Sequence, residues 1–329
     1  MKSPVASIAT LALIATTTFS GDCGYKAVPP KPTPPRLMIN GGTASGEPIW
    51  SPDGSYIYFN HRPLLDIVET HPGSHEFTYI FANSLAGFYR IDVTGQNLRR
   101  LSDFGLGNPC MAKDGAWIYY EESGQIWRIG RLGDTLDLAS KMQVTNSIDG
   151  AFDPSISYGG TRLLHDGLGS AAFPGIVITG AAGGASRRVG QPDSFHPDWG
   201  PRDSAFVFDA RGTNAYGIAI VDTIGVNPKA LRSDGSFPRW SPDGRRIAFM
   251  QRTSSAGYER DELWVMNRDG TSAHSLSTLP ILPEFSWSPN SNEIAFTHYW
   301  PDTSLTSGTI WIVNVDTMQR RQLTVNPDP

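Results

Sequence analysis

The chain has 329 residues, a formal net charge of −5 at pH 7, 39% hydrophobic residues and 18% charged residues. This acidic balance lacks the basic surface that binding to nucleic-acid phosphates requires, so no nucleic-acid partner is expected. The 34 Gly and 25 Pro are typical of a chain built from short strands and tight turns rather than from long helices.

The first 22 residues have the pattern of a secretory signal peptide. Met1 and Lys2 supply positive charge, and residues 5–19 form an apolar, Thr-rich stretch that is too short to span a bilayer. We therefore expect a signal peptide over residues 1–22. The mature protein is then exported to the periplasm or the outer membrane, or released outside the cell.

Cys23 follows this segment directly, at the place where a bacterial lipoprotein carries its acylated cysteine, although the preceding Ser-Gly-Asp matches a lipobox poorly. Two interpretations stay open. Cys23 carries a lipid anchor, or it is an unmodified thiol that stays free or pairs with Cys110. Cys110 itself is expected to act as a small buried residue. Five prolines between positions 28 and 36 favour extended polyproline II, which predicts a linker over 23–36 and a folded domain over 37–329.

A repeated string organises this domain. WSPDG occurs at residues 50–54 and 240–244, and WSPNS occurs at 287–291. In each copy an Ile-x-Phe pattern begins seven residues after the Trp. The same spacing identifies three weaker copies, which begin at Met111, Ile156 and Trp199. A proline stands two positions before the Trp position in five of the six copies: Pro48, Pro109, Pro154, Pro197 and Pro238.

Each unit also contains further alternating runs, such as residues 263–267 and 310–314, that are joined by turn signals. Four short strands in roughly 40–45 residues is the period of a β-propeller. We therefore predict an all-β fold, a six-bladed propeller with four antiparallel strands in each blade. Residues 36–39 or residues 321–325 are expected to supply the outer strand that closes the ring.

The chemistry of WSPDG predicts a structural motif. The Trp is expected to pack between adjacent sheets. Proline cannot donate a ladder hydrogen bond and should end the strand, while Asp-Gly should supply a turn with positive φ.

Six copies in phase make residues 36–329 similar to the TolB-like β-propeller family, whose repeat resembles P-x-W-S-P-D-G-x-x-I-x-F followed by R-x-L-T. The resemblance implies the six-bladed fold. The namesake of the family is a periplasmic component of an envelope complex and carries an additional N-terminal α/β domain. This chain has no room for that domain, so a stand-alone propeller is expected.

Motifs for catalysis are scarce. The sequence contains no G-x-S-x-G nucleophile elbow and no G-x-G-x-x-G phosphate loop, and two cysteines are too few for a cysteine-based metal site. His75-Glu76 lacks the second histidine of a zinc-protease helix, because Tyr79 stands in its place. The sequence therefore favours a protein that is not an enzyme, and no cofactor is expected.

The end of the second strand of each unit is the place where polar side chains could gather. His61, Glu122 and His298 occupy equivalent positions there, and the first and last units become neighbours when the ring closes. Two imidazoles and a carboxylate could hold a divalent metal, so these three residues are the candidate metal ligands. The competing interpretation is ordinary solvated loop-entry positions. In the six units, the residues just before this position are Asn60, Glu121, Asp166, Asp209, Met250 and Thr297.

His165 stands at the aromatic position of its unit and is expected to pack in the core.

The connections between the second and third strands of the first, fifth and sixth units are rich in residues that anchor interfaces. The candidate partner-binding residues are Arg252, Tyr258, Arg260, Tyr299 and Trp300. The competing interpretation is that these aromatic residues only cap their own blades.

The sequence therefore predicts a non-catalytic binding or scaffold protein of the bacterial cell envelope. It would recognise a protein or peptide partner on the loop face of the propeller. The alternative is a metal-assisted lyase or hydrolase with its site at the mouth of the channel.

Overall fold

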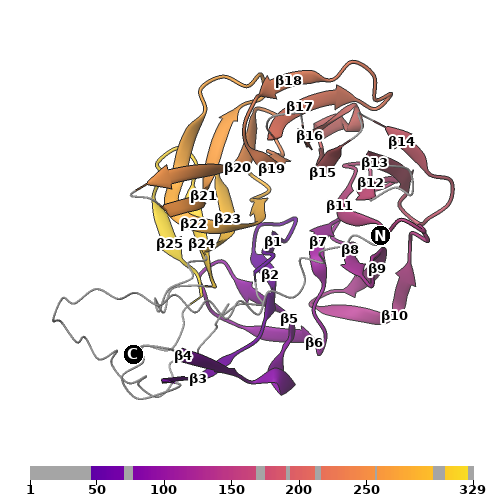
Figure 1. The fold of residues 1–329 in the computed structure, drawn as a ribbon. Helices are drawn as coiled ribbons and strands as arrows, with labels where there is room; N and C mark the ends of the chain where they lie inside the picture. The colour runs from indigo at the N-terminus through magenta and orange to yellow at the C-terminus, as the bar shows by residue number, and fades with distance from the viewer. Residues whose placement is uncertain are drawn as a thin grey trace, which may run out of the picture.

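A computed structural model describes residues 46–69, 77–167, 175–189, 193–211, 216–255, 258–298 and 308–324 (Figure 1). The predicted signal peptide, Cys23 and the Pro-rich linker lie outside these residues. In the part of the chain that the structure describes, no helix is long and apolar enough to cross a membrane.

Four antiparallel sheets of four strands each follow one another along the chain. The first sheet contains β1 (Ile49–Trp50), β2 (Tyr56–His61), β5 (Gly87–Asp92) and β6 (Arg99–Ser102). The second contains β7 (Gly107–Met111), β8 (Trp117–Glu122), β9 (Gln125–Leu132) and β10 (Thr135–Gln143). The third contains β11 (Phe152–Ile156), β12 (Arg162–Gly167), β13 (Gly175–Gly180) and β14 (Arg187–Val189). The fourth contains β15 (Ser194–Trp199), β16 (Ala205–Arg211), β17 (Tyr216–Asp222) and β18 (Lys229–Arg232).

The remaining strands form a seven-stranded sheet and one inserted hairpin. The large sheet contains β19 (Ser236–Trp240), β20 (Arg246–Ser255), β21 (Tyr258–Asn267), β22 (His274–Trp287), β23 (Glu293–His298), β24 (Thr309–Asn314) and β25 (Arg320–Gln322). The hairpin pairs β3 (Leu64–Glu69) with β4 (Phe77–Phe81) and lies between β2 and β5 along the chain. Two short 3-10 helices complete the described elements: η1 (Asn83–Leu85) and η2 (Pro201–Asp203).

The sheets stand around a ring, with β1, β7, β11, β15 and β19 toward its centre and β10, β14 and β18 at its periphery (Figure 1). The fold is therefore an all-β propeller with four-stranded antiparallel blades. The prediction of six separate four-stranded sheets is wrong for the described residues, which form four such sheets and one seven-stranded sheet. The last two units are joined because β22 pairs with both β21 and β23. Residues 274–277 and Pro280 of β22 pair with β21, and its second half, residues 281–287, pairs with β23.

The repeated WSPDG strings are the turns between the first and second strands, as expected. Strands β1, β19 and β22 end at Trp50, Trp240 and Trp287. In the fifth copy the Ser241 hydroxyl donates to Asp243 at 2.6 Å and accepts from the Arg246 backbone N–H at 2.9 Å. The glycine that follows has a φ of 75°, which a side chain rarely adopts. These local bonds satisfy the polar groups of the turn within a few residues of sequence.

The core lies between successive sheets. Trp199 is 2% exposed and packs with Leu164, Ile176 and Ile178 of the preceding sheet. Trp240 packs in the same way against Val207 and neighbouring residues of β16 and β17. This confirms the expected role of the motif tryptophan, which stabilises the contact between blades by burying a large apolar surface.

An apolar cluster closes the ring between the first and last described strands. Trp50 and Tyr89 of the first sheet pack with Ile310 and Leu323, which come from the chain's last strands and the segment that follows them. The Arg321 guanidinium also donates to the Val93 carbonyl at 2.5 Å. Strand β25 pairs with β24 as an outer strand, while residues 36–39 lie outside the described part of the chain.

Candidate functional site in the central channel

In four units the innermost strand is irregular at the residue that precedes the proline of the repeat. Because this proline has no N–H to donate, the ladder is interrupted there. The pairing shifts register at this place in β7, β11, β15 and β19, as it does at a bulge. A bulged residue turns its side chain away from the regular alternation. Five residues at this position have positive φ: Glu47 (49°), Asn108 (41°), Asp153 (50°), His196 (50°) and Phe237 (51°).

A left-handed backbone at glutamate or phenylalanine costs of the order of 1 kcal/mol or more. The conformation recurs in five of the six copies, so it is a property of the repeat. The sixth copy carries Glu284 at the same place, followed by Phe285 instead of a proline.

Five residues at this position, Glu47, Asn108, Asp153, Phe237 and Glu284, line a pocket of about 170 Å³ at the centre of the ring. All six copies of the repeat contribute to its wall. Among the residues that line it are Glu47, Asn108, Asp153, Asp198, Phe237 and Glu284.

The ends of the second strands add a further set of polar groups to the same region. Glu121 of β8 accepts from the Asn108 side-chain amide at 2.8 Å and from the Asp153 backbone N–H at 2.5 Å. Asn60 of β2 accepts from the Leu106 N–H at 2.8 Å, and its amide donates to Glu47. The positions just before the predicted metal ligands are therefore the ones that meet the bulged residues.

Carboxyl groups crowd this channel, and burial raises their pKa values. Loss of hydration is the main cause at Glu47, Glu121 and Glu284, and repulsion between neighbouring carboxylates adds to it. The pKa rises to about 7 for Glu121 and for Glu284, where Asp153 supplies part of the repulsion. The charged forms of these carboxyl groups are therefore costly, and the Arg239 guanidinium, which also lines the pocket, offsets only part of that cost at Glu284.

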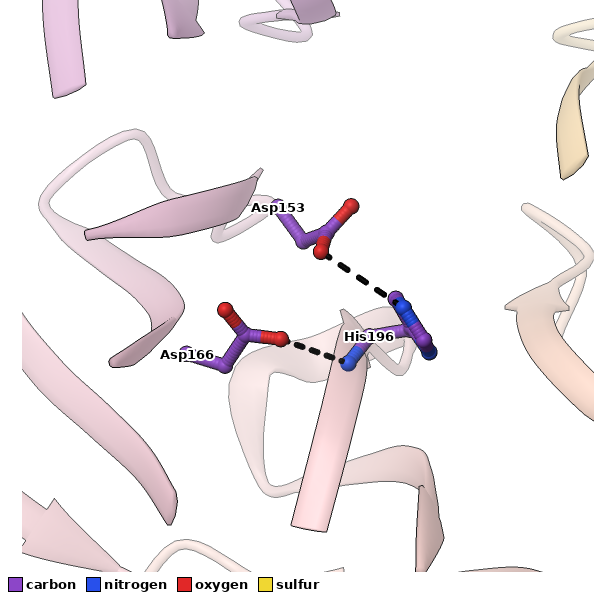
Figure 2. A group of neighbouring side chains, drawn as sticks. All are labelled: Asp153, Asp166 and His196. Carbon is purple, nitrogen blue, oxygen red and sulfur yellow. Dashed lines mark hydrogen bonds and ion pairs between the residues drawn. The ribbon is translucent and has the colours of Figure 1, made fainter. Parts of the chain in front are cut away.

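Beside this pocket, Asp153 from β11, Asp166 from β12 and His196 from β15 form a cluster (Figure 2). One potential ligand atom from each of the three lies within 4.8 Å of the others. The Asp153 carboxylate lies 3.7 Å from Nε2 of His196, and Asp166 accepts from the His196 backbone N–H at 3.2 Å. Nδ1 of His196 lies 2.7 Å from Oδ1 of Asp209, which is fully buried on β16.

The charges in this cluster depend on each other. Burial works against a protonated imidazole, but the carboxylates of Asp153, Asp209 and Asp166 outweigh it and raise the pKa of His196 to about 9. Burial, with repulsion from Asp153, raises the pKa of Asp166 well above its usual range. The His196 ring also stacks on Phe237, with ring centroids 3.6 Å apart.

The structure does not bring the predicted metal ligands His61, Glu122 and His298 into this cluster. His61 is 2% exposed and packs edge-on against Tyr89, with ring centroids 5.0 Å apart. His298 is buried, and its Nδ1 lies 2.8 Å from the Pro280 carbonyl. Glu122 forms an ion pair with Lys141 at 2.7 Å. A metal role for these three residues stays a prediction.

Only part of the predicted partner-binding set can be located. Arg252 and Arg260 lie on the β20–β21 hairpin, where they form ion pairs with Asp261 at 3.1 Å and Glu262 at 2.8 Å. The side chains of Tyr258, Tyr299 and Trp300 lie outside the described residues. Grouping of these five residues into one patch stays a prediction.

Two expectations about single residues have clear outcomes. His165 is 3% exposed, and burial lowers its pKa, so it is the packed core histidine that the sequence predicts. Cys110, expected to be a small buried residue, is only half-buried in the channel wall, and loss of hydration raises the pKa of its thiol to about 12. A thiol with this pKa is almost entirely protonated near neutral pH.

The position of the bulged residues is visible in the sequence, although the sequence-based prediction did not include them. They stand three positions before the motif Trp in every copy, immediately before the proline in five. A bulge at that proline changes the alternation by one residue. Simple period-two reasoning therefore assigns their side chains to the wrong face.

Comparisons with known proteins agree with the propeller architecture. No protein-family model and no curated protein matches the sequence. Among solved structures, TolB from Acinetobacter baumannii is 17% identical with a TM-score of 0.63, over 84% of this chain and 65% of that protein. A structure assigned to TolB from Agrobacterium tumefaciens is 19% identical with a TM-score of 0.57, over 69% of this chain and 84% of that protein.

Oligogalacturonate lyase from Vibrio parahaemolyticus is 12% identical with a TM-score of 0.55, over 90% of this chain and 81% of the lyase. Sequence identities this low establish a shared fold and leave function to the chemistry of the site. This chain is therefore similar in fold to TolB-like propellers.

Proposed function

We propose that this protein is an exported, non-catalytic binding protein of the bacterial cell envelope that recognises a protein or peptide partner. Its binding surface would be the loop face, where the second strand of each sheet leads into the third. The structural likeness to TolB propellers supports a binding role, and the distribution of extended loops on the ring supports this location.

The observation that carries the proposal is an asymmetry between the connections on this face. In the second sheet, β8 and β9 are joined by two residues, Ser123 and Gly124. The first sheet carries the whole β3–β4 hairpin at the equivalent place, and β20 and β21 extend to 10 residues each. Both hairpins reach outward from the ring (Figure 1). Extended loops on a rigid scaffold are a common place for recognition.

Arg252 and Arg260 place guanidinium groups on one of these hairpins, and each is held by a carboxylate of the same hairpin. Held arginines lose less side-chain entropy when they bind, so they suit an interface. With Tyr258, Tyr299 and Trp300 we propose that they form the anchor set. Interfaces typically depend on a few arginine, tyrosine and tryptophan side chains of this kind.

The test is capture of the partner from envelope extracts on immobilised protein. Trp300→Ala and Arg252→Ala should each weaken capture about thirtyfold, which corresponds to about 2 kcal/mol. Arg268→Ala is the matched control, since Arg268 is exposed in the turn after β21, at the other end of the same strand. Capture that resists the first two changes but is lost with Arg268→Ala would contradict the proposed face.

We also propose that the ring contains six blades, with the seven-stranded sheet counting as two. The support is the divided pairing of β22, whose first half pairs with β21 and whose second half pairs with β23. Its 14 residues would then serve as the outer strand of one blade and the inner strand of the next. An experimental structure with five or seven blades would overturn this count.

Export rests on the N-terminal sequence. We propose that residues 1–22 are removed as a signal peptide, that residues 23–36 are a linker and that Cys23 is a possible lipid attachment site. Replacing Cys23 with Ser and fractionating cells separates a lipid-anchored protein from a soluble exported one. Unprocessed protein in the cytosol would contradict export.

Catalysis by a metal-assisted lyase or hydrolase is the second function that the sequence raised. The likeness to an oligogalacturonate lyase is at the level of the fold only and does not favour it.

A further inference from the structure

The acidic channel contains one arrangement that goes beyond a binding role for the loop face. His196 is fixed in place by three independent contacts. Its Nδ1 lies 2.7 Å from Oδ1 of Asp209, its ring stacks on Phe237, and its backbone N–H donates to Asp166. Because a carboxylate can only accept, Nδ1 carries the proton toward Asp209. This contact directs Nε2 toward Asp153 (Figure 2).

The gap between Nε2 and Asp153 suits an ion better than a hydrogen bond. The distance of 3.7 Å exceeds the range of a good N–H···O bond, which is about 2.7–3.2 Å. Zinc lies about 2.0–2.2 Å from imidazole nitrogen and carboxylate oxygen, so two ligands of one ion stand well apart from each other. Asp166 supplies a third ligand atom within 4.8 Å of both.

A second, independent feature is an unpartnered carboxylate oxygen next to this cluster. Asp209 is fully buried, and its Oδ2 has no hydrogen-bond donor among the residues that the structure describes. Burying an uncompensated carboxylate oxygen costs free energy. The same carboxylate holds the imidazole by its other oxygen, which is the usual arrangement around a metal-binding histidine, where an outer carboxylate fixes the ring.

We propose that Asp153, Asp166 and His196 bind a divalent first-row transition-metal ion such as Zn²⁺ or Mn²⁺, with Asp209 orienting His196. An imidazole with two carboxylates suits these ions, whereas Ca²⁺ and Mg²⁺ prefer sites made of oxygen atoms. The proposal is independent of the partner on the loop face.

The position of these residues gives such an ion a structural consequence. Asp153 and Asp166 belong to the β11–β14 sheet, and His196 and Asp209 belong to the β15–β18 sheet. One ion would therefore join two neighbouring sheets at the wall of the channel. It would also neutralise part of the carboxylate charge that raises the pKa of Asp166 and Glu121.

The experiment uses the purified full chain, stripped with a chelator and titrated separately with ZnCl₂, MnCl₂ and CaCl₂. Calorimetry gives the affinity, and elemental analysis after desalting gives the stoichiometry. We expect one equivalent of Zn²⁺ or Mn²⁺. His196→Gln and Asp153→Asn should each abolish stoichiometric binding. Asp209→Asn, which alters only the outer partner, should weaken it about 10- to 100-fold.

Two matched controls distinguish this site from non-specific metal binding to other side chains. His274→Gln removes an exposed imidazole, and Glu122→Gln removes a carboxylate from the set that the sequence suggested. Both should bind metal as the unchanged protein does. Melting temperatures measured without metal check that each variant folds. If His196→Gln does not fold, Asp153→Asn and the absorption spectrum of a Co²⁺-loaded protein, which reports nitrogen and oxygen ligands, decide the matter.

Three results would overturn the proposal. The first is the absence of stoichiometric uptake of Zn²⁺ and Mn²⁺ by the unchanged chain. The second is unchanged uptake by folded Asp153→Asn and Asp209→Asn. The third is binding of Ca²⁺ in preference to both transition metals, which would show that the imidazole is not a ligand.

Discussion

The two ends of the inner strands carry similar polar residues and use them in different ways. At the turn end, Ser241 and Asp243 bond to each other and to backbone groups within five residues. At the channel end, Asp153 and His196 meet residues from other strands and a neighbouring sheet. Polar groups that are satisfied locally stabilise the fold. Those that converge from different repeats leave charge unbalanced and are available for a ligand.

The electrostatic effects have opposite signs at the two ends. Hydrogen bonds from Ser51 and Ser55 lower the pKa of the exposed Asp53 in its turn. In the channel, burial and repulsion raise the pKa of Glu284 to about 7. The folded state therefore favours the charged form of the first carboxyl and the neutral form of the second.

The largest expected effect comes from the tryptophan that begins the turn end. Trp199→Ala should lower the free energy of unfolding by about 3–5 kcal/mol, because it removes a large side chain that fills the contact between two sheets. Denaturant unfolding measures the loss. Met318→Ala, at an exposed side chain, should change stability by less than about 0.5 kcal/mol. Equal losses in the two variants would show that the tryptophan does not hold the sheets together.

Closure of the ring should show the next largest effect. Leu323→Ala should cost about 2–4 kcal/mol, because Leu323 is 6% exposed and packs with the cluster that joins the first and last strands. Thermal unfolding is the measurement. A melting temperature that does not change would mean that the ring is closed by a segment other than the one after β25.

A smaller loss is expected at the turn hydroxyl. Ser241→Ala removes a donor to Asp243 and an acceptor for the Arg246 N–H, and should cost about 1 kcal/mol. Ser233→Ala, at an exposed position between β18 and β19, is the matched control. If both substitutions are neutral, the hydrogen bonds of the turn do not contribute to stability.

Much of the fold could be predicted from the sequence because its determinants are local. The Trp-Ser-Pro-Asp-Gly string contains its own strand end, turn and cap, so six copies gave the type of strand and the propeller arrangement. The continuous strand β22 was not foreseen, since a regular repeat suggests a break between units and the sequence near Pro280 and Pro283 gives no sign that pairing continues on both sides.

The site could be predicted less well because it depends on which face each side chain takes. Glu121, Asp166 and Asp209 were among the polar positions expected near one face, and they do contact Asp153 or His196. His61 and His298 stand one residue after the positions that meet the bulged residues, so their side chains take the opposite face of the strand. They are buried against aromatic side chains. His196 was missed because a bulge directs its side chain, and the pattern of alternation does not reveal a bulge.

The most direct test of the difference between the two ends is one chemical change, carboxylate to amide, made at each. A carboxyl group whose pKa is raised in the folded state lowers the free energy of unfolding of the protein as pH rises from the unfolded-state pKa through the folded-state pKa. Glu284, which faces Glu47, Asp153 and Arg239, should therefore destabilise the metal-free protein increasingly as pH rises from about 4.5, with the full effect above about pH 7. Glu284→Gln should then raise the free energy of unfolding at about pH 8 by about 1 kcal/mol, allowing for solvent in the channel.

The same change should have little effect at about pH 4, where the Glu284 carboxyl is largely protonated in both the folded and the unfolded states. Asp53→Asn should lower the free energy of unfolding at about pH 8, since the folded turn favours the charged form of Asp53. The loss should be small, because Asn290 occupies the equivalent place in the last copy and accepts the same hydrogen bond, from Ser288. Denaturant unfolding of the metal-free protein at both pH values is the measurement. The account predicts opposite signs for the two variants at the higher pH, and a destabilised Glu284→Gln there would contradict it.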